Sequence, residues 1–267
     1  MHAIGQPRPV GRATRVIAPV VLVAVAILAW QAATWSGRMP ATVLPPPAAV
    51  AARLTRDLGS GTVGPRIATT LGEALAGCLV AALIALPLGY VLARWPVAEA
   101  AASPLIAASQ AIPAMAIAPL LVIWIGYGTA PVVALCALIV FFPMVLATVL
   151  GLRHVEPDLL AAAALDGAGG ASLLIHLQWP LARRTILTGL RGGFTLSITG
   201  AVVGEFVMGG RGLGELMSAQ MHSYDTTGMF ATIIVLCLLA VAIYLVIWAV
   251  EVLTDPLRPV PTREVPT

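Results

Sequence analysis

The sequence predicts an all-α membrane protein with about six transmembrane helices, and two observations carry this prediction. Only 10 % of the 267 residues are charged, whereas soluble proteins carry about 25 % charged residues. In addition, 59 % of the residues are hydrophobic, and they gather in uncharged runs long enough to cross a bilayer. A water-soluble domain cannot cover its surface with so few charges, and disorder requires low hydrophobicity, so both classes are excluded.

The first two predicted spans lie within the first 93 residues. Residues 16–35 contain no charge and follow Arg8, Arg12 and Arg15. This apolar stretch is too long for a cleaved signal peptide and lacks a clear small-residue cleavage site, so we expect an anchored span. Residues 74–93 form the second predicted span, which ends at Arg94.

The middle of the chain, residues 100–152, contains no charged side chain at all. Such a run is too long for one helix and suits two helices joined by a tight turn. Glycine and proline cluster between Gly126 and Pro131, which predicts the turn there. The third and fourth spans are therefore predicted over residues 103–124 and 131–152.

The last two spans differ in how clearly they are marked. Residues 226–250 form an unbroken apolar stretch, whereas residues 185–204 are interrupted by Arg191 and closed by Glu205. The resulting organisation is an N-terminal tail (1–15), a transmembrane domain (16–255) and a C-terminal tail (256–267). Residues 154–184 form a long loop within that domain.

The arginines predict the orientation of the chain. With the N-terminus inside, ten arginines fall in cytoplasmic segments and five in external segments, in the direction of the positive-inside rule. We therefore expect a multi-pass protein of the cytoplasmic (inner) membrane with both termini in the cytoplasm.

Missing residue types exclude several functions. The sequence has no lysine, so it can form neither a Walker A phosphate loop nor a lysine Schiff base. Its arginines are scattered and are not interleaved with aromatic residues, which argues against nucleic-acid binding. Cys78, Cys136 and Cys237 each lie in an apolar run and indicate neither a disulfide nor a metal site. No cofactor or catalytic residue is predicted.

The loop at 154–184 is predicted to form two short helices with a corner at Gly167. Alanines at 161–164 favour the first helix, and Asp158 lies in its first turn, where the helix dipole favours an acid. Leucines at 173, 174 and 177 predict a second, amphipathic helix that Pro180 stops. Such a protruding knob suits docking to a cytoplasmic partner.

The same loop resembles the cytoplasmic motif of binding-protein-dependent ABC importer permeases. That motif reads Glu-Ala-Ala, three residues, Gly, and a Pro thirteen residues later; here Ala161-Ala162-Ala163 precedes Gly167, and Pro180 follows thirteen residues on. The chain departs from it at Ala161, which replaces the glutamate. Further stretches resemble the sulfonate, nitrate and taurine branch of that family: Leu44-Pro45-Pro46-Pro47, Ile112-Pro113, Ala118-Pro119-Leu120, Trp124-Ile125-Gly126-Tyr127-Gly128, Phe141-Phe142-Pro143, Thr188-Gly189-Leu190-Arg191 and Gly212-Leu213-Gly214.

This resemblance implies the type I ABC importer permease fold and a permease for a small polar nutrient of the sulfonate, nitrate, taurine or vitamin-precursor class. A cytoplasmic ABC ATPase dimer would supply energy, a second permease copy would complete a homodimer in the lipid bilayer, and an extracytoplasmic substrate-binding protein would deliver the substrate. The residues implied to couple to the ATPase are Ala161, Ala162, Ala163, Asp166, Gly167, Ala168, Ser172 and Pro180.

Candidate pathway residues come from polar groups and prolines in the apolar runs. Ser109, Gln110 and Met115 lie close to Pro113, which can kink a helix and free backbone groups. Glu205 is a further candidate, since an acid at hydrocarbon depth costs about 2.5–3.5 kcal/mol. The alternative for this acid is a hydrogen bond to a neighbouring helix or a position at the membrane boundary.

Three other functions compete with the importer hypothesis. A proton-coupled secondary carrier would place several acids or histidines within its spans, and residues 100–152 have none. An intramembrane enzyme would need a nucleophile and a base at one depth, and no such pair is apparent. An ABC exporter domain is disfavoured because its ATPase is commonly fused to it.

Overall fold

The computed structural model describes residues 12–254, and within this range the secondary structure is entirely helical. Helices with their bounds are α1 (Arg12–Trp35), α2 (Pro47–Gly59), α3 (Val63–Arg94), α4 (Pro96–Gln110), α5 (Ala114–Ile125), α6 (Thr129–Arg153), α7 (Pro157–Leu165), α8 (Gly170–Leu173), α9 (Trp179–Met208), α10 (Leu213–His222) and α11 (Thr226–Thr254). Five of them (α1, α3, α6, α9 and α11) are long and apolar enough to cross a membrane, or six spans if α4 and α5 together count as one. The predicted all-α membrane class is confirmed.

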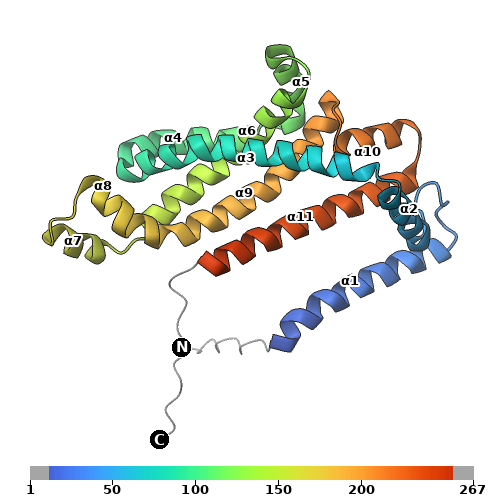
Figure 1. The fold of residues 1–267 in the computed structure, drawn as a ribbon, viewed down its shortest axis with the longest axis horizontal. Coiled ribbons are helices and arrows are strands. Elements are labelled where there is room, and N and C mark those ends of the chain that lie inside the picture. Colours follow the sequence, from blue (N-terminus) through green and yellow to red (C-terminus); the bar gives the residue numbers. More distant parts are fainter. Residues whose placement is uncertain (1–11, 255–267) are drawn as a thin grey trace, which may run out of the picture.

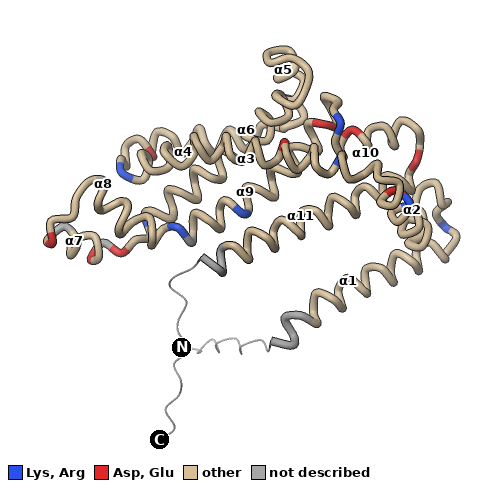
Figure 2. Tube along the Cα trace, in the orientation of Figure 1, with Lys and Arg blue, Asp and Glu red and all other residues tan. Residues whose placement is uncertain are grey.

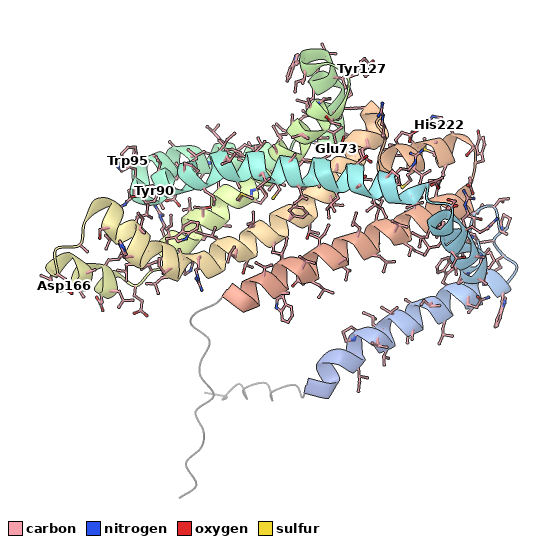
Figure 3. The ribbon with its side chains drawn as sticks, in the orientation of Figure 1. Glu73, Tyr90, Trp95, Tyr127, Asp166 and His222 are labelled. Carbon is pink, nitrogen blue, oxygen red and sulfur yellow. The ribbon has the colours of Figure 1, made fainter. Side chains whose placement is uncertain are left out.

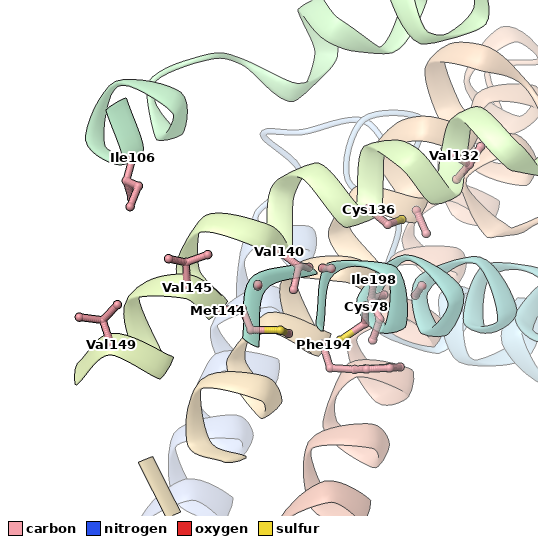
Figure 4. Close-up of a cluster of buried hydrophobic side chains, with 14 of the residues drawn as sticks. Cys78, Ile106, Val132, Cys136, Val140, Met144, Val145, Val149, Phe194 and Ile198 are labelled. Atoms are coloured by element: carbon pink, nitrogen blue, oxygen red, sulfur yellow. The ribbon is translucent and has the colours of Figure 1, made fainter. Parts of the chain in front are cut away.

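The core of the molecule lies where α3, α6 and α9 pack against one another (Figure 4). Its buried side chains include Cys78 from α3, Val140 and Met144 from α6, and Phe194 and Ile198 from α9.

Small residues let these three helices approach closely. A Cβ atom added to Gly193 of α9 would lie 2.8 Å from Cγ1 of Val140, and one added to Gly89 of α3 would lie 2.6 Å from Cβ of Thr148. The polar Ser197 fits the same layer because its hydroxyl donates a 2.7 Å hydrogen bond to the backbone oxygen of Ala74. This is the packing expected in lipid, where close contact and hydrogen bonds replace the hydrophobic effect.

Helix α1 lies outside this core and diverges from it toward its start (Figure 1), whereas α11 borders the core, with Ala240, Ile243 and Ile247 packed against it. Both helices are attached near the opposite end of the molecule. There the indole ring of Trp30 stacks on Phe230 at 5.6 Å, and its Nε1 donates a hydrogen bond to the backbone oxygen of Pro45.

The third predicted span, over residues 103–124, is not one continuous helix. The structure has two helices, α4 and α5, with axes that differ by 95°. The break falls at Pro113, which has extended backbone (φ −65°, ψ 124°) and precedes the first residue of α5. Hydropathy does not register this corner because the residues on both sides are apolar.

Helix ends also differ from several predictions. The second helix of the loop does not stop at Pro180, because a π-helical turn over Leu174–Gln178 leads directly into α9. Pro180 lies in the first turn of α9, where the missing backbone N–H would have had no partner within the helix. Helix α9 continues past Glu205 to Met208, and α3 begins at Val63, eleven residues before the predicted span. The short helices α2 and α10 were not predicted.

Candidate functional site

The loop implied to couple to an ATPase forms a projection at one end of the molecule, and we call residues 157–178 the coupling segment. Helix α7 ends before Gly167, whose φ of +82° only glycine adopts easily, and α8 with the π-helical turn returns the chain to α9. Asp166 marks the tip, far from Glu73 and His222 (Figure 3). The predicted glycine corner is therefore present, whereas the second helix is a short α-helical turn that runs into α9.

The surface of the coupling segment combines apolar and acidic side chains. Leu165 is 90 % exposed, and Ile175 is 59 % exposed. Asp158 and Asp166, and Glu156 just before the segment, are also exposed, and acidic positions are seen around α7 (Figure 2). Exposed leucine and isoleucine on a protruding segment are typical of a docking surface.

The structure places the coupling candidates unevenly on this surface. Ala161, Ala162, Asp166 and Ser172 are exposed, whereas Ala163 and Ala168 are half-buried. The backbone N–H of Ala168 donates a 2.9 Å hydrogen bond to the oxygen of Ala163, which holds the corner closed. Pro180 is half-buried at the junction with α9.

Two of the pathway candidates, Ser109 and Gln110, line one cavity of about 340 Å³ between α4, α6 and α9. Phe142 and Thr199 also line it, and none of its lining residues carries a charge. The Ser109 hydroxyl is already used within α4, where it donates to the backbone oxygen of Ile106. Such a cavity can hold a polar but uncharged solute.

The other pathway candidates lie elsewhere. Pro113 forms the corner between α4 and α5, and Met115 is 56 % exposed on the first turn of α5. Glu205 is completely buried and lines none of the cavities described here. Sequence reasoning missed Thr199, although its position three residues after Leu196 on a span places both on the same helix face.

Glu205 is held in a polar centre between α3, α9 and α10. One carboxyl oxygen accepts a 2.7 Å hydrogen bond from Thr70 Oγ1, and the other accepts a 2.6 Å bond from the backbone N–H of Gly214. Thr70 Oγ1 in turn accepts a hydrogen bond from the N–H of Leu213, so two free N–H groups at the start of α10 are satisfied. The alternative of an acid bonded to neighbouring helices therefore describes Glu205.

Two glycines at the start of α10 leave room for this centre. A Cβ atom on Gly212 would overlap the Glu205 carboxyl group, and one on Gly214 would overlap the backbone oxygen of Val202. Glu73 is also buried, beside Glu205.

Ion pairs tie the helices together at this end of the molecule. Arg66 of α3 pairs with Glu215 of α10, and Arg53 of α2 pairs with Asp57 and, at 2.7 Å, with Asp225. Burial works against the charge of Arg53, but its two carboxylate partners raise its pKa overall. Asp225 is thus a structural residue.

The chain is similar to known proteins in both sequence and fold. Residues 85–258 match the family described as "Binding-protein-dependent transport system inner membrane component". The chain belongs to this family. The permease is 40 % identical over 233 residues to the riboflavin transport system permease protein RibX of Chloroflexus aurantiacus, covering 87 % of each chain. It is 32 % identical to the formylaminopyrimidine transport permease protein ThiX of Halalkalibacterium halodurans, covering 81 % of this chain and 86 % of the relative.

Its fold is also that of a solved transporter. Inward-facing structures of the MetNI methionine ABC transporter superpose with a TM-score of 0.66 at 16 % identity, covering 74 % of this chain and 98 % of the other. The type I importer fold is confirmed, and the permease is a multi-pass inner-membrane subunit that translocates small nutrients. The hypotheses of a self-sufficient carrier and of an intramembrane enzyme are thereby set aside. Family membership implies an ABC ATPase and a substrate-binding protein as partners.

Proposed function

We propose that this permease works as a homodimer that imports a flat, uncharged heteroaromatic nutrient of the riboflavin class, driven by two ATPase subunits docked on the coupling segments. The observation that carries the substrate class is the uncharged cavity, which offers the Gln110 amide and the Thr199 hydroxyl for hydrogen bonds beside the Phe142 ring. A charged sulfonate finds no cation there. The similarity to the riboflavin permease supports the same class.

The proposed orientation has both termini and the coupling segment in the cytoplasm. Helix α1 starts, and α3, α6 and α11 end, on the side from which the coupling segment projects (Figure 1). Arg94 and Arg153 end their helices on this side. The polar centre at Glu205 then faces the external half, where the binding protein delivers substrate.

Docking on the coupling segment is tested by cross-linking. In a Cys237→Ala background, which leaves only the buried Cys78 and Cys136, we expect Ser172→Cys or Ala168→Cys to form a disulfide with a cysteine in the co-expressed ATPase. Ser223→Cys, at the opposite end, is the matched control and should react only with membrane-impermeant maleimide added outside. An ATPase adduct at position 223 and none at 168 or 172 would contradict the proposed orientation and show that the chain has the opposite one.

The substrate class is tested by uptake of labelled riboflavin in cells that depend on this permease, its ATPase and its binding protein. Gln110→Ala should lower uptake about three- to tenfold, the value of one neutral hydrogen bond. Riboflavin binding to the isolated binding protein should not change. Uptake of taurine in place of riboflavin, or unaltered riboflavin uptake in Gln110→Ala, would contradict the assignment.

A further inference from the structure

Two buried acids share the polar centre between α3, α9 and α10. Glu73 of α3 (Figure 3) is only 5 % exposed and Glu205 of α9 is completely buried, and their carboxyl groups lie within hydrogen-bond reach of each other. Both come from helices that are long and apolar enough to cross a membrane. The cavity at Gln110 is lined by neither of them, so the proposed transport function leaves the pair without a role.

Two neighbouring carboxylates cannot both stay ionised in such a place. An ionised carboxyl group only accepts hydrogen bonds, so two of them side by side have no hydrogen to share and repel each other. Burial between helices removes the water that would otherwise weaken this repulsion. One bound proton turns one group into an O–H donor and leaves a single charge, and the resulting charge-assisted hydrogen bond is a strong one.

The hydrogen-bond partners indicate which group carries the proton. Both oxygens of Glu205 already accept hydrogen bonds, one from Thr70 Oγ1 at 2.7 Å and one from the Gly214 N–H at 2.6 Å. Donors at both oxygens stabilise a negative charge, which fits Glu205 as the carboxylate. Glu73 Oε2 is buried and has no hydrogen-bond partner among the described residues. Glu73 is therefore the group that gains from carrying a proton, which it can donate to Glu205.

Neighbouring side chains have no hydrogen left for Glu73. The Thr70 hydroxyl is used in the hydrogen bond described above. The Ser197 hydroxyl donates to the backbone oxygen of Ala74, and the Cys136 thiol donates to the backbone oxygen of Ser197. Cys136 is the titratable group of α6 that faces the pair, and it is uncharged as a donor. An ionised Glu73 would thus receive no hydrogen bond from these three side chains.

The charged groups around the pair do not compensate a second negative charge. Glu215 of α10 brings a further negative charge toward Glu205. Arg66 of α3 is paired with Glu215 and also donates a hydrogen bond to the backbone oxygen of Gly212. Arg211, in the loop between α9 and α10, is exposed. The charge of Arg66 is therefore matched by Glu215 and leaves none for two carboxylates.

A metal ion fits the pair less well than a proton. Within the described part of the chain, no group of three or more His, Cys, Asp or Glu side chains could hold a metal ion. The space is also filled, since a Cβ atom on Gly212 would overlap the Glu205 carboxyl group and one on Gly214 would lie 2.8 Å from Cβ of Glu205. Hard cations such as Mg²⁺ and Ca²⁺ take about six or more oxygen ligands, whereas a shared proton needs only two.

We propose that Glu73 and Glu205 together bind one proton, which Glu73 carries and donates to the Glu205 carboxylate. The proton joins α3 to α9, and the same carboxylate accepts the Gly214 N–H at the start of α10. Loss of the proton should therefore loosen the contact among these helices. The inference depends on neither the proposed orientation nor the proposed substrate, so it is tested separately from them.

The proton is tested by infrared spectroscopy of the permease–ATPase complex in dodecyl maltoside, a detergent without a carbonyl group. A protonated carboxylic acid has a C=O stretching band that an ionised carboxylate lacks. At neutral pH, the difference spectrum between wild type and Glu73→Gln should contain one such band, which should shift in ²H₂O. Glu215→Gln removes an ion-paired carboxylate and is the matched control, which should keep the band. Absence of the band from the wild-type spectrum would overturn the proposal.

The pH dependence of stability tests the role of Glu73. The folded pair holds one proton more than the unfolded chain at neutral pH, so stability should fall as pH rises, by up to about tenfold in the folding equilibrium constant per pH unit. Glu73→Gln, whose amide donates to Glu205 at every pH, should remove this contribution to the slope. Glu215→Gln should keep the wild-type slope. SDS titration of the purified permease, followed by circular dichroism at a series of pH values, measures it.

Glu205→Gln distinguishes the two members of the pair. In this variant an amide N–H would face one of the two existing donors, Thr70 or Gly214, so it should unfold at a lower SDS fraction than Glu73→Gln. The reverse order, or a wild-type slope in Glu73→Gln, would overturn the proposal. The titration is repeated with choline in place of sodium and should not change. A sodium-dependent midpoint that is lost in Glu73→Gln would assign the pair to a metal ion and would also overturn it.

Discussion

Helices α6 and α11 have equally long apolar spans, yet they are used in opposite ways. The 25-residue span of α6 has 44 % of its most apolar window buried inside the protein, whereas the more apolar α11 has only 6 % buried. Apolarity therefore decides that a helix enters the membrane but not what it packs against. In lipid, packing depends on shape and on polar contacts, and these distinguish the two regions.

The shape of the core comes from small residues at particular positions. Gly77 and Gly89 of α3 face α6, and Gly193 and Gly200 of α9 also face α6, each without room for a side chain. Helix α11 instead presents large exposed side chains such as Leu245 and Val246. The core is thus specified by contacts, and the outer region is left available to lipid or to a partner.

The largest loss is expected where the core is polar. Glu205→Ala leaves Thr70 and the Gly214 N–H without their acceptor, so the free energy of unfolding should fall by about 3 kcal/mol or more. SDS titration of the purified permease, followed by circular dichroism, measures it. Glu215→Ala removes an ion pair about one-third exposed and should cost about 1 kcal/mol or less. Equal losses in the two variants would mean that the Glu205 centre is not a structural contact.

A smaller loss is expected from crowding the core. Gly77→Ala places a Cβ atom against the Cys136 side chain and 3.0 Å from the Val133 oxygen, so stability should fall by about 1–3 kcal/mol. Gly72→Ala in the same helix meets nothing within 4 Å and should stabilise by up to about 1 kcal/mol through helix propensity. The same SDS titration compares them. If both alanines stabilise the protein, close approach is not what holds α3 to α6.

The smallest effect is expected in the outer region. Leu245→Ala on α11 shortens a side chain that is 52 % exposed, so the free energy of unfolding in detergent should change by no more than about 0.5 kcal/mol. Leu135→Ala on α6, which is fully buried, should cost about 2–5 kcal/mol in the same assay. A large loss at Leu245 in the isolated permease would show that α11 is packed as tightly as α6.

The sequence predicts the helical class well because the signals involved are local. The turn predicted near residues 126–131 appears as Gly126 and Gly128 with positive φ, followed by the start of α6 at Thr129. The corner at Gly167 is equally local. Composition was enough to separate this chain from soluble proteins before any contact was known.

The parts that could not be predicted depend on residues far apart in the sequence. The hydrogen bond between Thr70 and Glu205 joins positions 135 residues apart, and no local sequence pattern predicts it. Helices α2 and α10 are too short and too polar to register as spans, although Arg53 and Asp57 at i and i+4 were a signal for α2. Thr199 entered the candidate site only when α4 and α9 were seen to share a cavity.

The Glu205 centre also constrains how the protein is made. A nascent chain leaves the translocon from its N-terminus, so α3 with Thr70 is already in the bilayer when α9 emerges carrying a carboxylate at its far end. Helix α10 follows directly, and its first N–H groups complete the acceptor set within nine residues of synthesis. Glu205 can therefore accept a hydrogen bond from the Thr70 hydroxyl, which is already in place, and one from the Gly214 N–H once α10 has formed. The order of synthesis therefore matches the order in which the Glu205 carboxyl group gains its hydrogen-bond donors.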